Sequence, residues 1–250
     1  MKKIKVDSEK IKMAIQAELP LTVTTYTLPP EMEEYISDVL EIFLKSLNQS
    51  HMFDSLSYCV KELVNNAKKA NTKRIYFTLK KLDLNKKEDY EKGMANFKED
   101  TINNIKYYLE EQRKHGYFIK VLFQTRNNKI KIEVKNKAEL TYFEFKRIHD
   151  KITRAQQFDT VEQGMLHLLD GSEGAGLGIA ILVLVLRKIG LTEENFQVLS
   201  ENGETITRII LPVFNKDKEE ISLLTRVFVN AIDGLPEFPE NITRINGLIN

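Results

Sequence analysis

The chain has 250 residues, with 37 basic and 36 acidic side chains and a formal net charge of +1. This length fits one large domain, or one domain with an added segment. Because nucleic-acid-binding proteins carry a strongly basic surface, the near-neutral balance predicts no nucleic-acid partner. The composition, with 42% hydrophobic residues, is that of a compact globular protein and excludes a disordered or collagen-like chain.

Cysteine content and hydropathy exclude further classes. The single cysteine, Cys59, excludes an intrachain disulfide and a cysteine-cluster metal site. The longest apolar run, 177–186, is about half as long as a membrane-spanning helix. The basic first residues are not followed by the apolar stretch of a signal peptide. These observations predict a cytoplasmic protein without a membrane partner.

The first third of the chain alternates between helical and extended patterns. Helices are predicted where apolar residues recur at helical spacing, and strands where β-branched and aromatic residues cluster. The predicted helices are 8–17, 32–47 and 52–70, and the predicted strands are 21–28 and 73–80.

A polar segment, 83–115, follows and has apolar residues at helical spacing, which predicts a helical insertion. Asn127 and Asn128 predict a tight turn between two strands, because Asn tolerates positive φ. Beyond the insertion, strands are predicted over 118–125, 129–135, 196–200 and 205–214, and helices over 141–155, 178–189 and 219–232.

Helices and strands interleave, and several neighbouring strands are joined by short turns. This order predicts an α/β (α+β) two-layer sandwich with a mixed, largely antiparallel sheet. We expect an N-terminal extension (1–20), a domain over 21–214 that contains the insertion, and a C-terminal helix and tail (215–250). The apolar face of the 219–232 helix could form a homodimer contact.

Three polar residues share one face of the predicted helix 52–70. Glu62 and Asn66 are four residues apart, and Lys69 follows three residues later. A carboxylate, a carboxamide and an ammonium group in one column could orient a water or hydroxyl, bind Mg²⁺ through oxygen and contact a phosphate. The alternative is the solvated face of an amphipathic helix.

A glycine-rich segment leads directly into the predicted helix 178–189. Gly174, Gly176 and Gly178 would let the backbone approach a phosphate at the amino end of that helix. The spacing matches neither the dinucleotide-binding fingerprint nor the P-loop. The alternative is a flexible loop with a glycine-rich turn.

Taken in order, the two motifs resemble those of the Bergerat-fold (GHKL) ATPases, which include histidine kinases, anti-sigma-factor serine kinases, type II topoisomerases and heat-shock chaperones. The segment 62–70 resembles the N-box of this family, and 174–181 resembles its G2 box in the histidine-kinase style. The resemblance covers about 21–214 and implies the Bergerat fold, with helices on one face of the sheet. It also implies binding of ATP with Mg²⁺.

The resemblance assigns a role to each matching residue. Asn66 would coordinate Mg²⁺, Glu62 would act as general base or position water or the metal, and Lys69 would approach the phosphates. Thr205 would lie near the adenine pocket, and 152–173 would form a lid over ATP. The residues implied to wrap the triphosphate are Gly174, Gly176, Leu177 and Gly178.

One motif departs from the family. The family usually has Asp-x-Gly-x-Gly after the central strand, and its Asp accepts a hydrogen bond from the adenine amino group. Here Asn136 stands in the Asp position, and Ala138 and Leu140 replace the glycines. An amide oxygen can still accept a hydrogen bond but carries no charge. We therefore expect adenine recognition that is weaker than in the family.

Two functional hypotheses follow. In the first, the chain is a histidine-kinase-like ATPase or kinase domain that transfers the γ-phosphoryl group of Mg-ATP to a partner protein in a signalling pathway. In the second, it is a catalytically degenerate, nucleotide-sensing or protein-binding regulatory module. Its regulated partner would then contact 83–115 and 217–250.

Overall fold

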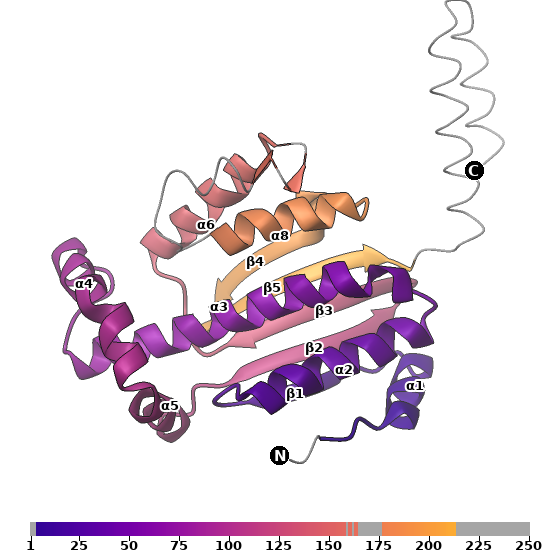
Figure 1. The fold of residues 1–250 in the computed structure, drawn as a ribbon, viewed down its shortest axis with the longest axis horizontal. Coiled ribbons are helices and arrows are strands. Elements are labelled where there is room, and N and C mark those ends of the chain that lie inside the picture. Colours follow the sequence, from indigo (N-terminus) through magenta and orange to yellow (C-terminus); the bar gives the residue numbers. More distant parts are fainter. Residues whose placement is uncertain (1–3, 159, 162, 165–176, 214–250) are drawn as a thin grey trace, which may run out of the picture. The chain divides into compact units, whose positions relative to one another are not determined.

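The strands of the computed structural model form one antiparallel sheet in the order β1-β2-β3-β5-β4 (Figure 1). The structure describes residues 4–158, 160, 161, 163, 164 and 177–213, and the unit considered below ends at Pro212. Within it, the strands are β1 (Leu21–Thr25), β2 (Ile119–Arg126), β3 (Lys129–Asn136), β4 (Phe196–Glu201) and β5 (Glu204–Pro212).

Helices α2, α3 and α8 lie over the same face of this sheet, and α3 packs on β3 and on α8 (Figure 1). This arrangement agrees with the predicted two-layer α/β sandwich, although every strand pair among the described residues is antiparallel. The described helices are α1 (Ser8–Gln16), α2 (Pro30–Ser46), η1 (Ser50–Met52), α3 (Phe53–Leu79), α4 (Lys87–Asn103), α5 (Ile105–Lys114), α6 (Tyr142–Ala155), α8 (Leu177–Lys188) and η2 (Glu193–Asn195).

The sheet has an apolar face and a polar face because side chains alternate along each strand. On β2, Val121 and Phe123 are buried under the helices, and the ring of Phe123 lies 5.9 Å from that of Phe43 on α2. On the opposite face, Arg208 pairs with Glu133 across β5 and β3 at 2.7 Å. One-sided burial of this kind fits helices that cover a single face of an antiparallel sheet.

Both hairpins have tight turns, as the sequence predicts for Asn127 and Asn128. Asn127 and Asn128 have φ values of 50° and 57°, and Asn202 and Gly203 have 54° and 77°. Positive φ at both central residues is the pattern of two-residue turns whose twist matches that of the flanking strands. These turns fix the register of β2 against β3 and of β4 against β5.

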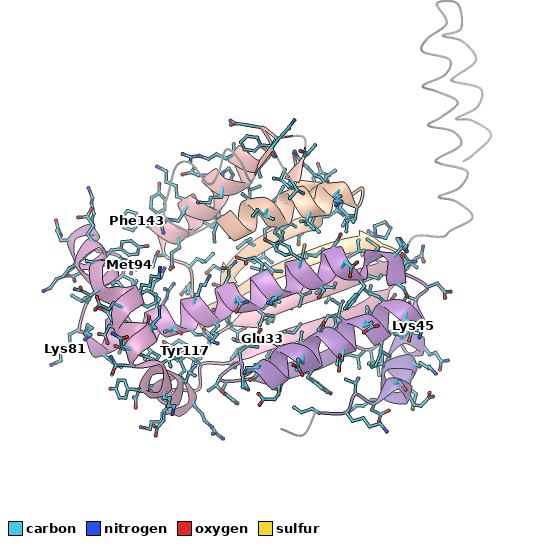
Figure 2. All side chains as sticks on the ribbon, in the orientation of Figure 1. Glu33, Lys45, Lys81, Met94, Tyr117 and Phe143 are labelled. Carbon is cyan, nitrogen blue, oxygen red and sulfur yellow. The ribbon has the colours of Figure 1, made fainter. Side chains whose placement is uncertain are left out.

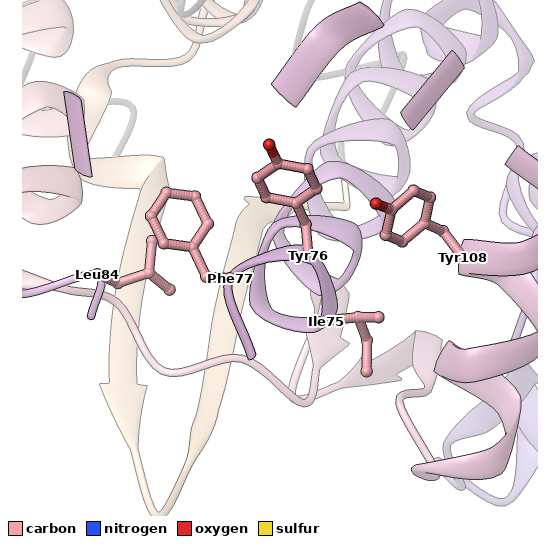
Figure 3. Packing of buried hydrophobic residues seen from close by; sticks show 5 residues of the cluster. All are labelled: Ile75, Tyr76, Phe77, Leu84 and Tyr108. Carbon is pink, nitrogen blue, oxygen red and sulfur yellow. The ribbon is translucent and has the colours of Figure 1, made fainter. Parts of the chain in front are cut away.

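The prediction of a strand over 73–80 is wrong, because α3 continues to Leu79. The β-branched and aromatic residues that suggested a strand instead fill a second core around the end of this helix (Figure 3). Thr78 fits the helix by donating its hydroxyl to the carbonyl of Arg74, one turn earlier. Tertiary packing thus outweighs local strand propensity. The buried residues of this second core are Ile75, Tyr76, Phe77, Leu84 and Tyr108.

The predicted helical segment 83–115 consists of two helices, α4 and α5, which connect α3 to β2. The ring of Tyr76 on α3 lies 5.3 Å from Phe97 on α4 and 5.9 Å from Tyr108 on α5. Met94 and Tyr117, labelled in Figure 2, also pack on this cluster. The two helices therefore cover the far end of α3 and not the sheet.

Several predictions concern parts of the chain outside the described residues. They are the helix over 219–232 with its dimer contact, the tail beyond it, half of the lid over 152–173, and Gly174 and Gly176.

Candidate functional site

A cavity of about 200 Å³ lies among α3, α6, α8 and the ends of the central strands. Residues from motifs that are far apart along the chain line this cavity together. Apolar side chains form part of its wall, including Ala67 on α3, Ile179 on α8 and Val198 on β4. The predicted site residues that line it are Glu62, Asn66, Lys69, Asn136 and Thr205.

Helix α3 presents the polar column to this cavity beside a stripe of buried apolar residues. Leu63 and Ala67 are buried, and they alternate with the polar residues at helical spacing. Glu62, Asn66 and Lys69 therefore project from the same side of one rigid helix. The predicted column on one helix face is confirmed.

The sheet register brings the next two residues together. Asn136, the last residue of β3, pairs directly with Thr205 on β5. The Thr205 hydroxyl donates to the carbonyl of Ala138, and the Leu140 N–H donates to Ser200 Oγ at 2.8 Å. The loop that lacks the expected glycines is thus tied to the β4–β5 hairpin by hydrogen bonds.

Asn136 is buried, with 3% of its surface exposed. Its Nδ2 donates to Oδ1 of Asn71 on α3 at 3.2 Å. No donor among the described residues contacts Asn136 Oδ1. An amide oxygen without a donor among the described residues, on a residue that lines a cavity, suits a ligand that brings a polar hydrogen.

Helix α6 supplies cations that the sequence analysis did not assign. Arg147 and Lys151 are four residues apart on α6, and both line the cavity with Lys69. Within the described part of the chain, no carboxylate lies within ion-pair distance of these three groups. Burial lowers the pKa of Lys151, and the charges of Arg147 and Arg154 lower it further. A bound polyanion would offset this cationic charge.

Glu144 joins α6 to α3 at the edge of the cavity. Its carboxylate accepts from Lys73 Nζ at 2.9 Å and pairs with Arg74 at 2.5 Å. Burial acts to raise the pKa of Glu144, but the hydrogen bond from Arg74 and the charges of Lys73 and Arg74 outweigh it and lower this pKa to about 2. The same carboxylate completes a capping box with Thr141. Glu144 therefore serves as an anchor and not as a free charge in the cavity.

The first turn of α8 abuts Glu62. A Cβ added at Gly178 would overlap the Glu62 carboxylate, so glycine permits this close approach. One turn before Glu62 on α3, burial raises the pKa of Tyr58, and the negative charge of Glu62 raises it further. Leu177, the neighbour of Gly178, begins α8, so the amino end of this helix lies beside the polar column.

Side-chain oxygens in the cavity wall could take part in binding a metal ion. In the described ranges, no three His, Cys, Asp or Glu residues gather closely enough to hold a metal ion. Asn66 and Glu62 nevertheless offer oxygen atoms in the cavity wall. Mg²⁺ is commonly held by one or two protein oxygens together with the phosphates of its ligand. These two residues fit that mode of binding.

A larger cavity, of about 330 Å³, lies on the other side of α3 against α2. It is lined by Glu33 and Glu34, with Lys61 as its cation, and it also contains Asn65, the neighbour of Asn66. Two carboxylates and one ammonium group disfavour a polyanionic ligand. The two adjacent asparagines of α3 therefore line different cavities of opposite charge character.

In comparisons with known proteins, the chain is similar to part of a longer protein. A protein of Treponema pallidum (strain Nichols), described as an uncharacterized protein, is 42% identical over 246 residues. The match covers 98% of this chain and 48% of that protein, so the chain spans about half the length of this relative. No family model and no solved structure matches the chain. No helix of the described residues is long and apolar enough to cross a membrane.

Proposed function

We propose that the chain is a Bergerat-type, histidine-kinase-like domain that binds Mg-ATP and passes the γ-phosphoryl group to a partner protein. The observation that carries this proposal is the convergence of Glu62, Asn66, Lys69, Asn136 and Thr205 on one cavity. These residues come from one helix and two strands, and the sequence motifs alone predict them as site residues.

The cavity offers each kind of contact that a nucleoside triphosphate needs. Asn136 Oδ1 can accept from an exocyclic amino group, and apolar side chains such as Ile179 and Val198 can contact a flat ring. Lys69, Arg147 and Lys151 can offset the charge of phosphates. A cavity with a polar acceptor, apolar walls and a cluster of cations suits a nucleotide better than it suits an uncharged metabolite.

Each of these residues would have a separate role in the reaction. Bound Mg-ATP supplies the γ-phosphoryl group and the charge of the metal. Asn66 would hold the metal through its amide oxygen, and Lys69 would neutralise phosphate charge from the next turn of α3. Glu62 would accept the proton of the attacking hydroxyl, imidazole or water, or hold that group in position. Positioning and electrostatics would provide most of the catalysis.

Calorimetric titration of ATP in the presence of Mg²⁺ tests the proposal. Wild type is expected to bind, and Asn66→Ala is expected to weaken Mg-dependent binding by about tenfold or more, because it removes an oxygen ligand. Asn65→Ala is the matched control: it removes the same side chain from the preceding residue of α3, which lines the other cavity. Absence of ATP binding by wild type at millimolar concentration would overturn the proposal.

Gly178 provides a second test, directed at catalysis. Gly178→Ala is expected to slow the loss of the γ-phosphate by about 10–100-fold, because the new methyl group displaces the Glu62 carboxylate. The displaced atoms are the end of a flexible side chain, so the thermal midpoint should change little. Rates measured at saturating Mg-ATP, together with thermal melts of both proteins, check this. An unchanged rate would show that the position of Glu62 does not matter.

A regulatory module is the second candidate, and the residue at 136 favours it. A neutral amide stands where the family has a carboxylate, and the loop up to Leu140 lacks glycine. Mg-ATP binding without any loss of the γ-phosphate, with or without a partner, would support this reading.

A further inference from the structure

Two buried amides form a chain of hydrogen bonds that starts at a backbone carbonyl. Asn71 Nδ2 donates to the carbonyl oxygen of Phe118 at 3.0 Å, and Asn136 Nδ2 donates to Asn71 Oδ1 at 3.2 Å. Asn71 is fully buried, and Asn136 is 3% exposed. The chain therefore runs from a fixed acceptor before β2, through α3, to the wall of the cavity.

The carbonyl of Phe118 sets the direction of the whole chain. A backbone carbonyl can only accept, so Asn71 must turn its NH₂ group toward it and its oxygen toward Asn136. Asn136 must then turn its own NH₂ group toward Asn71. Rotating either amide by half a turn would bring two oxygens together inside the fold, which leaves buried groups unpaired.

This constraint matters because an amide, unlike a carboxylate, has two different ends. A carboxylate at 136 would accept hydrogen bonds in either orientation, whereas Asn136 accepts only through Oδ1. With its Nδ2 held by Asn71, the atom that Asn136 can offer to a ligand is the oxygen. Asn71 thus fixes which end of the Asn136 amide faces the ligand. The ligand then meets a hydrogen-bond acceptor, as it would at an aspartate.

We propose that Asn71 is a positioning residue that makes the cavity selective for a 6-aminopurine nucleotide over a 6-oxopurine nucleotide. The inference depends on the proposed function. The 6-amino group of adenine can donate to Asn136 Oδ1, whereas the 6-oxo group of hypoxanthine would place a second acceptor against it. A site built to receive a donor rejects a ligand that lacks one.

The test compares the binding of Mg-ATP and Mg-ITP by calorimetry. Wild type is expected to bind ATP about tenfold or more tightly than ITP, which corresponds to one hydrogen bond and one avoided clash of acceptors. In Asn71→Leu, Asn136 loses its anchor and can present either end, so the ATP:ITP affinity ratio should fall toward one. Asn65→Leu is the matched control, since it makes the same change at an asparagine of α3 that lines the other cavity, and it should keep the selectivity.

The outcomes separate this inference from the proposed function. If wild type binds neither nucleotide, the proposed function fails. If wild type prefers ATP and folded Asn71→Leu keeps the same ratio, the role of Asn71 fails while nucleotide binding stands. Equal affinity of wild type for the two nucleotides would also overturn the role.

A measurement without nucleotide covers the case in which Asn71→Leu does not fold. The side-chain NH₂ protons of Asn136 in the wild-type protein are expected to exchange slowly with solvent, because they are buried and bonded to Asn71. Exchange at the rate of an exposed asparagine would show that the amide turns freely and would contradict the inference.

Discussion

Glu62→Gln is expected to bind Mg-ATP about as tightly as wild type and to lose the γ-phosphate about 10²–10⁴-fold more slowly, the range for removal of a general base. Gln keeps the length of the side chain and an oxygen that can position water, but it cannot take up a proton. The side chain lines the cavity beside Asn66 and lies against Gly178 at the start of α8. Few other single changes separate binding from turnover so directly.

Single-turnover measurement of phosphate release from Mg-ATP, with calorimetry on the same samples, checks this expectation. Glu34→Gln is the matched control because it neutralises a carboxylate in the other cavity of α3. The control should behave as wild type does in both measurements. Turnover of Glu62→Gln at the wild-type rate would show that Glu62 takes no part in the reaction. Loss of Mg-ATP binding would show that Glu62 binds the metal or the nucleotide instead.

Much of the site could be predicted because its elements are encoded by short-range patterns. The apolar stripe that contains Leu63 and Ala67 has helical spacing, so the polar column beside it on α3 follows from the sequence. Turn residues such as Asn127 and Gly203 define the hairpins. The pairing of β3 with β5, which puts Asn136 opposite Thr205, joins the two hairpins and lies beyond any local pattern.

The features that sequence analysis missed depend on contacts between distant segments. Tyr76 and Phe77 have strand propensity, and only their packing against α4 and α5 explains why α3 continues through them. Arg147 and Lys151 have helical spacing, but that spacing does not reveal that they face the cavity. Nothing in the sequence distinguishes Asn71 from other polar residues. Its role follows only from its hydrogen bonds to β3 and to the segment before β2.

The second prediction with a large effect concerns the acid stability of the fold. Glu144→Gln is expected to lower the free energy of unfolding at pH 7 by about 3 kcal/mol, the equivalent of a carboxyl pKa that falls from 4.5 to about 2 on folding. The carboxylate side chain is 11% exposed, so solvent screens its pairs with Lys73 and Arg74 only weakly. Gln at this position can still complete the capping box with Thr141, so the variant isolates the charge.

The pH dependence distinguishes this ion-pair effect from a packing defect. Because the folded-state pKa is below the unfolded-state value, the stabilisation is fully present above about pH 5 and is lost as the pH falls toward about 2. Urea unfolding of the two proteins between pH 2 and pH 7 should therefore give curves that converge at low pH. Glu9→Gln removes an exposed ion pair with Lys12 and should change stability little at any pH. A constant difference between wild type and Glu144→Gln across this range would assign the loss to packing, and the anchor between α6 and α3 would then not depend on its charge.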